Sequence, residues 1–458
     1  MKINAIVLYV LLMVGSTAGA KDITVSTVSE LKDAVANAAA GDIIRVAAGN
    51  YVISTIPGFT ISKSGTATNK IQLIAVEGER PVLNFTGQSR NNSSAKGVAL
   101  KASYWHIKGI DFHGAGDNGM QISGGHYNTI EHCRFYRCND TGLQVDNGSS
   151  NNLVLNCDSY FNADASLENA DGFAPKLTVG SNNKFVGCRA WRNLDDGFDG
   201  YLRGADNVTT YYEDCWVFEN GKNEQGVNGV GDGNGFKTGG SDAVSGTSTK
   251  VLKHNGVLTR CIAVNNRVKG FDHNSNRGDI TLYNCAATGN GTNMGFGSTN
   301  PLNKLTIKNT VVVGSTGSLN ATTKDISNNS WDSGVSATSA DYVDFTASRF
   351  YEILSAPRKA DGSLPDLPMW ILVSGSDLID KGVNVGLSFV GSAPDLGPFE
   401  YDPLASVQEP IVDHGRIVLE QFYSISGQEV HHDYQGVLIV RRTYEDGSQS
   451  VSKIYQQK

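Results

Sequence analysis

Two features that would place this 458-residue chain in a membrane or against nucleic acid are missing. After the first twenty residues no long apolar run remains, which excludes a membrane-spanning helix in the mature chain. The formal net charge is −8 at pH 7, so the surface as a whole repels polyanions such as nucleic acids. Only five residues are methionine, 18% are charged and 52 are glycine, and the chain is long enough to bury a sizeable core.

The one long apolar run lies at the N-terminus. Lys2 precedes apolar residues from Ala5 to Val14, and Ala18-Gly-Ala20 follows as a cleavage site. We therefore expect residues 1–20 to be a cleavable signal peptide and the protein to be secreted, periplasmic or on the cell surface. No cysteine follows the cleavage site, so a lipid anchor is not expected.

An internal repeat runs through the middle of the chain. From Cys133 onward, successive repeat cysteines lie 24, 31, 27, 46 and 24 residues apart, and an asparagine follows each later one by five residues. These pairs are Cys157 and Asn162, Cys188 and Asn193, Cys215 and Asn220, Cys261 and Asn266, and Cys285 and Asn290. In the first unit Cys138 stands in the asparagine place. We expect the cysteines to be buried free thiols, because their place in the repeat is a packing position.

Each unit continues with a glycine and a large apolar residue. These are Gly142-Leu143, Gly172-Phe173, Gly197-Phe198, Gly235-Phe236, Gly270-Phe271 and Gly295-Phe296. The units contain short β-rich runs separated by Gly, Asn and Asp, and they lack helical spacing of apolar residues. A repeat with a constant core and one variable loop predicts a solenoid, here an all-β parallel β-helix. Its stacked asparagines are expected to hydrogen-bond from coil to coil.

The two ends of the solenoid differ from its middle. Thr27-Val-Ser-Glu30 resembles a capping box, and the apolar spacing after it predicts a short N-terminal helix that closes the first coil. Residues 302–313 predict one more coil. Residues 325–401 are less regular, and within them residues 378–382 and 395–400 are expected to pack against the C-terminal end. A β-rich appendix at 406–458 resembles the C-terminal sorting domains of proteins exported by Bacteroidetes. The predicted organisation is a signal peptide (1–20), a β-helix domain (21–405) and this appendix (406–458).

Acidic residues recur in register with the repeat. Asp171 precedes the glycine of one unit, and Asp195, Asp196 and Asp199 surround the glycine of the next. Neighbouring coils of a β-helix are about 4.8 Å apart, so these four carboxylates should converge. Without a cation they would repel one another, and calcium, which takes six to eight oxygen ligands, resolves that repulsion. The alternative is a solvated acidic loop, because Asp and Gly are common in turns.

The residue after each unit's buried phenylalanine should point outward from the strand. Asp199, Lys237 and Asp272 hold that position in three successive units, so we expect them to stand on one exposed face. A lysine next to a dication loses its proton more easily, and the same cation can bind a substrate carboxylate and acidify the adjacent carbon-bound proton. This combination predicts β-elimination from a uronic acid, with Lys237 as the base.

Further residues in or near these loops could contact a substrate. They are Lys176, Arg203, Arg267, Lys269, Asp272, Asn274 and Arg277. An ordinary surface position is an equal alternative for each of the cations.

Four segments together resemble the signature of polysaccharide lyase family 9. They are residues 169–177 (NADGFAPKL), 188–199 (CRAWRNLDDGFD), 233–239 (GNGFKTG) and 270–274 (GFDHN). The resemblance implies a right-handed parallel β-helix, a catalytic calcium on Asp171, Asp195, Asp196 and Asp199, and Lys237 as the Brønsted base. It also implies an acidic pectic polysaccharide as the partner, either polygalacturonate or rhamnogalacturonan I, and we expect a monomer.

Two other classes of function fit parts of the sequence. A β-helix glycoside hydrolase of polygalacturonase type would use paired carboxyl groups, which Asp195 and Asp196 superficially offer. Such enzymes carry Gly-His-Gly and Arg-Ile-Lys segments, and this sequence has neither. A non-catalytic carbohydrate-binding β-helix would need only a calcium-stabilised acidic loop. The sequence leaves open which pectic polymer is cut and whether attack is internal or from a chain end.

Overall fold

The computed structural model describes residues 19–166, 169–332, 334–402, 417–424, 426–432, 434, 436–444 and 449–456. It divides into a large unit ending at Tyr401 and a small one beginning at Asp402. The predicted signal peptide lies outside the described residues, apart from its last two positions. No helix in the described part of the chain is long and apolar enough to cross a membrane.

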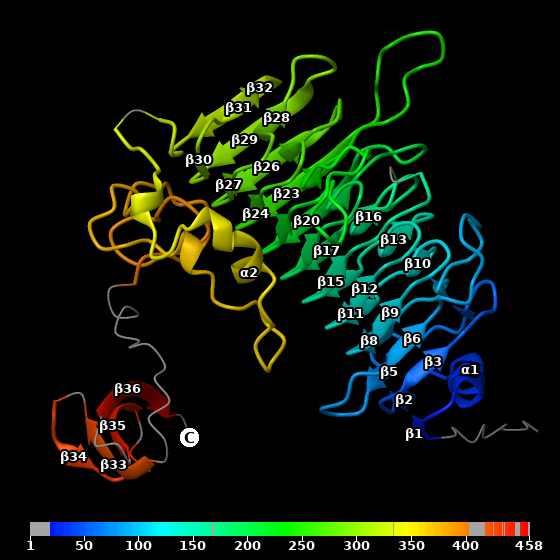
Figure 1. Ribbon diagram of the computed structural model, residues 1–458, viewed down its shortest axis with the longest axis horizontal. Coiled ribbons are helices and arrows are strands. Elements are labelled where there is room, and N and C mark those ends of the chain that lie inside the picture. Colours follow the sequence, from blue (N-terminus) through cyan, green and yellow to red (C-terminus); the bar gives the residue numbers. More distant parts are fainter. Residues whose placement is uncertain are drawn as a thin grey trace, which may run out of the picture. The chain divides into compact units, whose positions relative to one another are not determined.

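The large unit is a right-handed β-helix of three parallel sheets, which confirms the predicted fold (Figure 1). The first sheet contains β1 (Asp22–Val25), β2 (Ile43–Val46), β5 (Ile71–Ala75), β8 (Trp105–Lys108), β11 (Thr129–Glu131), β14 (Leu153–Leu155), β17 (Asn183–Val186), β20 (Val208–Glu213), β23 (His254–Thr259), β26 (Asp279–Tyr283), β29 (Leu302–Lys308) and β32 (Ala321–Ser327).

The second sheet contains β3 (Asn50–Val52), β6 (Val82–Asn84), β9 (Asp111–His113), β12 (Arg134–Tyr136), β15 (Asp158–Tyr160), β18 (Arg189–Trp191), β21 (Trp216–Phe218), β24 (Ile262–Val264), β27 (Ala286–Thr288) and β30 (Val311–Val313). The third contains β4 (Phe59–Ile61), β7 (Val98–Leu100), β10 (Met120–Ser123), β13 (Leu143–Asp146), β16 (Phe173–Pro175), β19 (Phe198–Asp199), β22 (Phe236–Lys237), β25 (Lys269–Asp272), β28 (Thr292–Phe296) and β31 (Gly317–Leu319).

The cysteines and asparagines of the repeat occupy fixed places in each coil. Cys188, for example, lies between β17 and β18, and Asn193 follows β18. All seven cysteines are buried and free, as predicted. The asparagine ladder is also found: each side-chain amide donates to the side-chain oxygen of the next, at 2.8 to 3.0 Å from Asn162 through to Asn290. Asn162 accepts from the backbone of Cys138, which therefore ends the ladder in the asparagine place of its own coil.

A helix, α1 (Val28–Ala36), lies next to the first coils as expected. The Thr27 hydroxyl accepts from the Glu30 backbone, and the Glu30 carboxylate accepts from the Thr27 backbone, so the predicted capping box is present. Leu31 and Val35 of this helix are buried. The coil predicted at residues 302–313 is formed by β29 and β30.

The segments expected to pack against the C-terminal end, residues 378–382 and 395–400, contact the last coils: Asn328, which follows β32, donates to the Lys381 carbonyl, and Gly397 donates to the Asn309 carbonyl. Only β32 extends the helix; residues 334–401, with η1 (Ser339–Asp341), η2 (Ala347–Arg349), α2 (Phe350–Leu354) and η3 (Pro368–Trp370), cover the outer face of the second sheet (Figure 1). The physical reason is that the late strands of this sheet are apolar on both faces. Trp216, Ile262 and Val311 point outward and are buried against residues such as Phe350 and Trp370.

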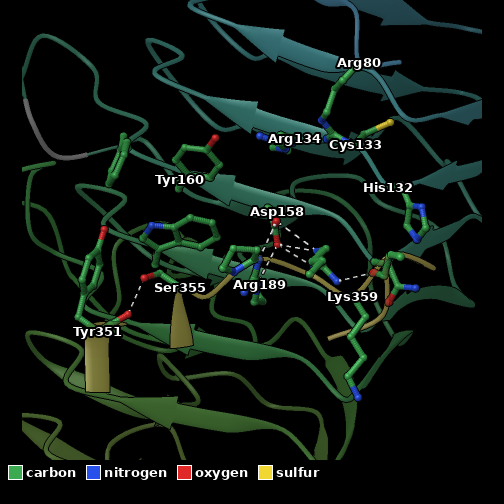
Figure 2. Close-up of a pocket in the computed structure, with 17 residues that line it drawn as sticks. Arg80, His132, Cys133, Arg134, Asp158, Tyr160, Arg189, Tyr351, Ser355 and Lys359 are labelled. Carbon is green, nitrogen blue, oxygen red and sulfur yellow. Dashed lines mark hydrogen bonds and ion pairs between the residues drawn. The ribbon is translucent and has the colours of Figure 1, made fainter. Parts of the chain in front are cut away.

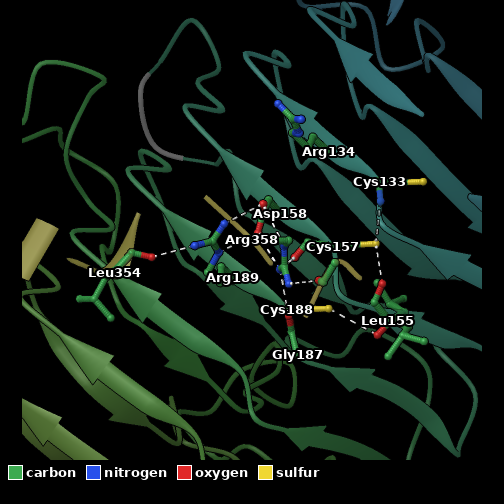
Figure 3. A network of polar contacts seen from close by, with 12 residues as sticks. Cys133, Arg134, Leu155, Cys157, Asp158, Gly187, Cys188, Arg189, Leu354 and Arg358 are labelled. Carbon is green, nitrogen blue, oxygen red and sulfur yellow. Dashed lines mark hydrogen bonds and ion pairs between the residues drawn. The ribbon is translucent and has the colours of Figure 1, made fainter. Parts of the chain in front are cut away.

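A buried ion-pair network holds the covering segment to the second sheet (Figure 3). The Asp158 carboxylate lies between the guanidiniums of Arg189, at 2.9 Å, and Arg358, at 2.7 Å. Arg189 also donates to the carbonyls of Leu354 and Ala356. The two cations therefore hold the pKa of Asp158 below its usual range, although burial alone would raise it.

The small unit contains an antiparallel sheet, described by itself. Its strand order is β34 (Glu429–Val430), β33 (Ile417–Ser424), β35 (Gly436–Tyr444) and β36 (Gln449–Gln456). A β-rich appendix at the C-terminus is thus present, and these described strands pair only with one another.

Candidate functional site

The third sheet positions the candidate site. Phe173, Phe198, Phe236 and Phe271 stack inside the helix with ring centroids 5.1 to 5.2 Å apart. The residues after them are in register, with Asp199 opposite Lys237 and Lys237 opposite Asp272. The glycine before each phenylalanine is required by close packing: a Cβ on Gly172 would lie 2.6 Å from the Gly197 carbonyl oxygen of the next coil.

The prediction that Asp199, Lys237 and Asp272 stand on an exposed face was wrong. Asp199 is 4% exposed, Lys237 7% and Asp272 2%. These side chains do leave the helix core, but loops from neighbouring coils cover them. One such loop passes over Lys237, where Asp232 donates its backbone N–H to the Asp195 carboxylate. The three side chains therefore lie in a largely water-excluded setting, in which charges interact strongly.

Three of the four predicted ligands form a compact group. Asp171, Asp195 and Asp196 can each place one carboxylate oxygen within 4.8 Å of the other two. Asp199 stands beside this trio and is connected to it through lysines. The Lys176 ammonium lies 2.8 Å from Asp171 and 3.4 Å from Asp199.

Lys237 contacts the other side of the cluster. Its Nζ lies 2.8 Å from Asp196, 3.5 Å from Asp199 and 3.3 Å from Asp232. It forms no ion pair with Asp272, which instead lies 3.1 Å from Lys269. The Lys237 ammonium is therefore ion-paired with Asp196 and Asp199, two of the residues that were predicted to bind a cation.

Crowding of buried carboxylates changes their proton affinities. Burial, together with Asp196 and Asp171, raises the pKa of Asp195 to about 10. Burial also raises the pKa of Asp196 to about 7, although Lys237 opposes it, and raises that of Asp171 to about 6. These buried acids cannot all ionise at neutral pH without a compensating cation.

Lys237 responds in the opposite direction. Its burial would lower its pKa, but Asp196, Asp199, Asp195 and Asp171 outweigh that effect and raise the pKa well above the usual value. The ammonium form is therefore favoured as long as the surrounding carboxylate charge is not compensated.

The donor set suits a hard divalent cation. The side-chain oxygen of Asn234 is buried and accepts no hydrogen bond from the described residues, and Asp196 Oδ2 faces Lys237 without an aligned hydrogen bond. With the trio, these atoms offer several oxygens and no sulfur or imidazole ligand, which fits calcium better than a transition metal. Asp171, Asp195, Asp196 and the adjacent Asp199 are the residues that would hold it.

A cavity of about 540 Å³ opens next to the cluster. It is lined by Asn91, Ser93, Asp117, Asn139, Asp140, Gln144, Asp164, Asn169, Lys176, Leu177, Asp195, Asp199, Tyr201, Arg203 and Lys237. A cavity of this size is within the range that accommodates small ligands or short oligomers. Because it includes Lys237 and two of the aspartates, it is the natural place for a substrate.

Comparison with known proteins decides the family. The model described as "Pel9A-like, right handed beta helix region" matches residues 12–309. The chain belongs to polysaccharide lyase family 9. Pectate lyase L of Dickeya chrysanthemi is 37% identical over 377 residues, which cover 80% of this chain and 84% of that protein.

Two solved structures resemble this family 9 member. The crystal structure of pectate lyase Pel9A superposes with a TM-score of 0.71 at 34% identity, covering 81% of this chain and 90% of that one. A structure named rhamnogalacturonan lyase superposes with a TM-score of 0.63 at 26% identity, covering 73% and 89%. The family match ends at residue 309, beyond all the strands that carry the cluster and Lys237.

The predicted substrate contacts of this family 9 chain fall into two groups. Lys176 and Arg203 line the cavity. The others do not line it: Arg267, Lys269, Asp272, Asn274 and Arg277. Arg267 instead donates to the backbone carbonyls of Gly231 and Asp232 and so supports the loop over Lys237.

Sequence reasoning missed residues of the variable loop and of the earlier coils. Asp232 contacts Lys237 from the variable loop, where no register could place it. Asp117, Asp140 and Gln144 extend the cavity over earlier coils. Part of this polar surface over the earlier coils could have been found in the sequence. Asn118 and Thr141 precede the glycines of the earlier units and so occupy the same repeat position as Asp171.

Proposed function

We propose that this family 9 polysaccharide lyase is a calcium-dependent enzyme that cleaves a galacturonate-containing pectic backbone by β-elimination, with Lys237 as the Brønsted base. The observation that carries the proposal is the position of Lys237 Nζ, 2.8 Å from Asp196 and at the wall of the cavity. A lysine with no chemical role would be costly to bury in such a place.

The chain's own residues account for the proton transfer. Neutral Lys237 Nζ takes the proton from the carbon next to the substrate carboxylate, and the electron pair of that C–H bond forms a carbon–carbon double bond. The bond from the neighbouring carbon to the glycosidic oxygen breaks, and this oxygen leaves with the bonding electrons and takes up a proton from water. Calcium, when bound, supplies a positive charge that holds the substrate carboxylate and acidifies this proton. Lys176 and Arg203 lie where they can bind further carboxylates of the polymer.

We propose polygalacturonate as the first substrate to test. Support comes from the proteins named pectate lyase, which match at 34% to 37% identity over about four-fifths of the chain. The protein named rhamnogalacturonan lyase is less similar, so rhamnogalacturonan I is the alternative. Both polymers present a galacturonate to the base, and the neighbouring sugar distinguishes them.

The proposal is tested by incubating the protein with each polymer, with added calcium or with excess chelator. Ultraviolet absorbance of unsaturated uronate products should rise with calcium and stop in chelator. A hydrolase would release reducing ends without this absorbance, and a binding module would release neither. Full turnover in chelator, after trapped metal has been excluded, would remove calcium from the mechanism.

We also propose that the protein is exported. The supporting features are the signal-like residues 1–20 and the appendix that resembles sorting domains. Fractionation of cells expressing the full chain, compared with a chain starting at Lys21, tests this proposal. Retention of the full chain in the cytoplasm would contradict it.

A further inference from the structure

A second cavity, of about 600 Å³, lies on a different sheet from the aspartate cluster (Figure 2). It lies between the outer face of the second sheet and the covering segment around α2. Its lining comes from Arg80, His132, Cys133, Arg134, Asn156, Asp158, Tyr160, Phe161, Arg189, Trp191, Tyr351, Ser355, Pro357, Arg358, Lys359, Ala360 and Gly362. No residue lines both cavities.

The lining carries an excess of positive charge. Arg189 and Arg358 share the single carboxylate of Asp158. Arg80 and Arg134 share Asp111, which lies 2.7 Å from the first and 3.6 Å from the second.

Four guanidiniums thus face two carboxylates. The other basic groups do not change this balance, because Lys359 is paired with Asp366 at 2.6 Å and burial lowers the pKa of His132. Two uncompensated cations in one cavity of a chain with net charge −8 favour an anionic ligand.

The two arginine pairs differ in how many of their N–H groups are already used, since Arg80 and Arg134 contact the Asp111 carboxylate but retain further N–H groups. Arg358 donates to Asp158 and to the carbonyls of Gly362, Cys157 and Gly187, so its function is structural (Figure 3). Arg80 and Arg134 have side chains that are 32% and 42% exposed, and Figure 2 shows both in the cavity wall. They can turn guanidinium N–H groups toward a ligand without breaking the buried network.

The aromatic residues of the lining restrict the kind of ligand. Tyr160 is stacked between Tyr136, at 5.2 Å, and Trp191, at 4.3 Å, so both of its ring faces are occupied. A flat aromatic ligand therefore finds no face of Tyr160 on which to stack. The Trp191 indole N–H is buried and has no hydrogen-bond partner among the described residues, and it is available to an acceptor such as a sugar oxygen.

We propose that this cavity binds a short carboxylate-bearing saccharide through Arg80 and Arg134, at a site separate from the one around Lys237. Arg80 and Arg134 share one carboxylate, so one carboxylate of a uronate disaccharide matches their excess charge, and a disaccharide fits a cavity of this volume. The negative charge of the ligand is inferred from the arginine charges alone, whereas its identity as a saccharide rests on the proposed function. Such a site would retain cleavage products or anchor a chain outside the catalytic cavity.

The test is calorimetric titration of digalacturonate into the full-length protein carrying Lys237→Ala, in excess chelator, so that turnover and calcium-bridged binding are absent. Adding Arg134→Ala should raise Kd by about tenfold or more, because a charge-assisted guanidinium contact is lost. Arg260→Ala is the matched control, since Arg260 pairs with Asp214 and Glu213 away from the cavity, and it should leave Kd unchanged. Equal affinity of the two variants, or no binding at all, would overturn the proposal.

Two further probes separate the possible ligands. Neutral galactobiose should not bind. Inorganic phosphate should bind more weakly than digalacturonate; equally tight, Arg134-dependent binding of phosphate would overturn the assignment to a saccharide. Turnover of polygalacturonate by an Arg134→Ala protein with Lys237 intact should match that of the parent. A parent protein without turnover would refute the proposed function, yet Arg134-dependent binding of digalacturonate would still establish this cavity as a site.

Discussion

Lys237 is the residue on which the proposed chemistry depends. Lys237→Ala should lower turnover by about 10²- to 10⁴-fold, because the group that accepts the carbon-bound proton is lost. Calcium binding should persist, since the carboxylates remain and lose only a neighbouring positive charge. The measurement is the rate of unsaturated product formation together with calorimetric calcium affinity. Residual activity within about tenfold of the parent would remove Lys237 from the role of base.

Asp195 makes the calcium-free protein sensitive to pH. Its folded-state pKa, about 10, lies above the value of about 3.9 expected in the unfolded chain. The folded state therefore binds the extra proton, and its stability falls as pH rises toward the folded pKa. In chelator, the unfolding midpoint should fall from about pH 5 to pH 9, and it should fall less in Asp195→Asn.

Calcium should reverse this dependence. The proposed ligands are ionised carboxylates, so calcium affinity should rise over the same pH range, and saturating calcium should remove the loss of stability. Lys237 and Lys176 do not contribute to this pH dependence. Their pKa values are raised in the folded state, so the stability that they add stays constant below about pH 10. Parallel melting curves for the parent and Asp195→Asn in chelator would contradict the interpretation.

Individual site residues were predictable where the repeat fixes them. The register of Asp199 with Lys237 follows from their equivalent positions after Phe198 and Phe236, and the structure has that register. The burial of these side chains was not predictable, because it depends on loops of unequal length that cover them. Asp232 shows the same limit: it reaches Lys237 only through the fold of a loop that no repeat constrains.

Among the structural elements, the asparagine ladder is expected to contribute strongly to stability. Asn220 is fully buried, donates to Ala190 and Asn266, and accepts from Asn193. Asn220→Ala leaves these buried groups unpaired and should lower the free energy of unfolding by about 2 to 4 kcal/mol. Chemical denaturation measures the change.

An exposed asparagine is the control for this prediction. Asn303 makes one side-chain bond, to Asp279, at the surface, and Asn303→Ala should change stability by less than about 0.5 kcal/mol. Equal effects of the two substitutions would show that the ladder adds nothing beyond an ordinary surface hydrogen bond.

The covering segment shows what sequence patterns at the level of elements can miss. Residues 334–401 have little regular structure, so nothing in their own spacing indicates where they pack. The signal lay instead in the strands they cover: β21, β24 and β30 are apolar at every position, which indicates burial on both faces of the sheet. The core of a parallel β-helix buries only the inner face of each sheet. Another part of the chain must therefore bury the outer face.

At the scale of the whole molecule, the described residues of the proposed catalytic site lie in the large unit. The aspartate cluster, Lys237 and both cavities belong to residues before 402, and the described strands of the small unit pair only with one another. A chain ending at Tyr401 should therefore keep the turnover and the unfolding midpoint of the parent. Loss of turnover at an unchanged midpoint would mean that the small unit takes part in catalysis.

A shorter chain ending at Ser330 provides the contrast. It would remove the cover from Trp216, Ile262 and Val311 and take away Arg358, one of the two cations that compensate buried Asp158. Exposing this apolar face and unbalancing the ion network should lower the unfolding midpoint and cause aggregation. Differential scanning calorimetry and light scattering of the two truncated chains check both expectations. If the Ser330 chain were as stable as the Tyr401 chain, the covering segment would not belong to the folded core of the β-helix.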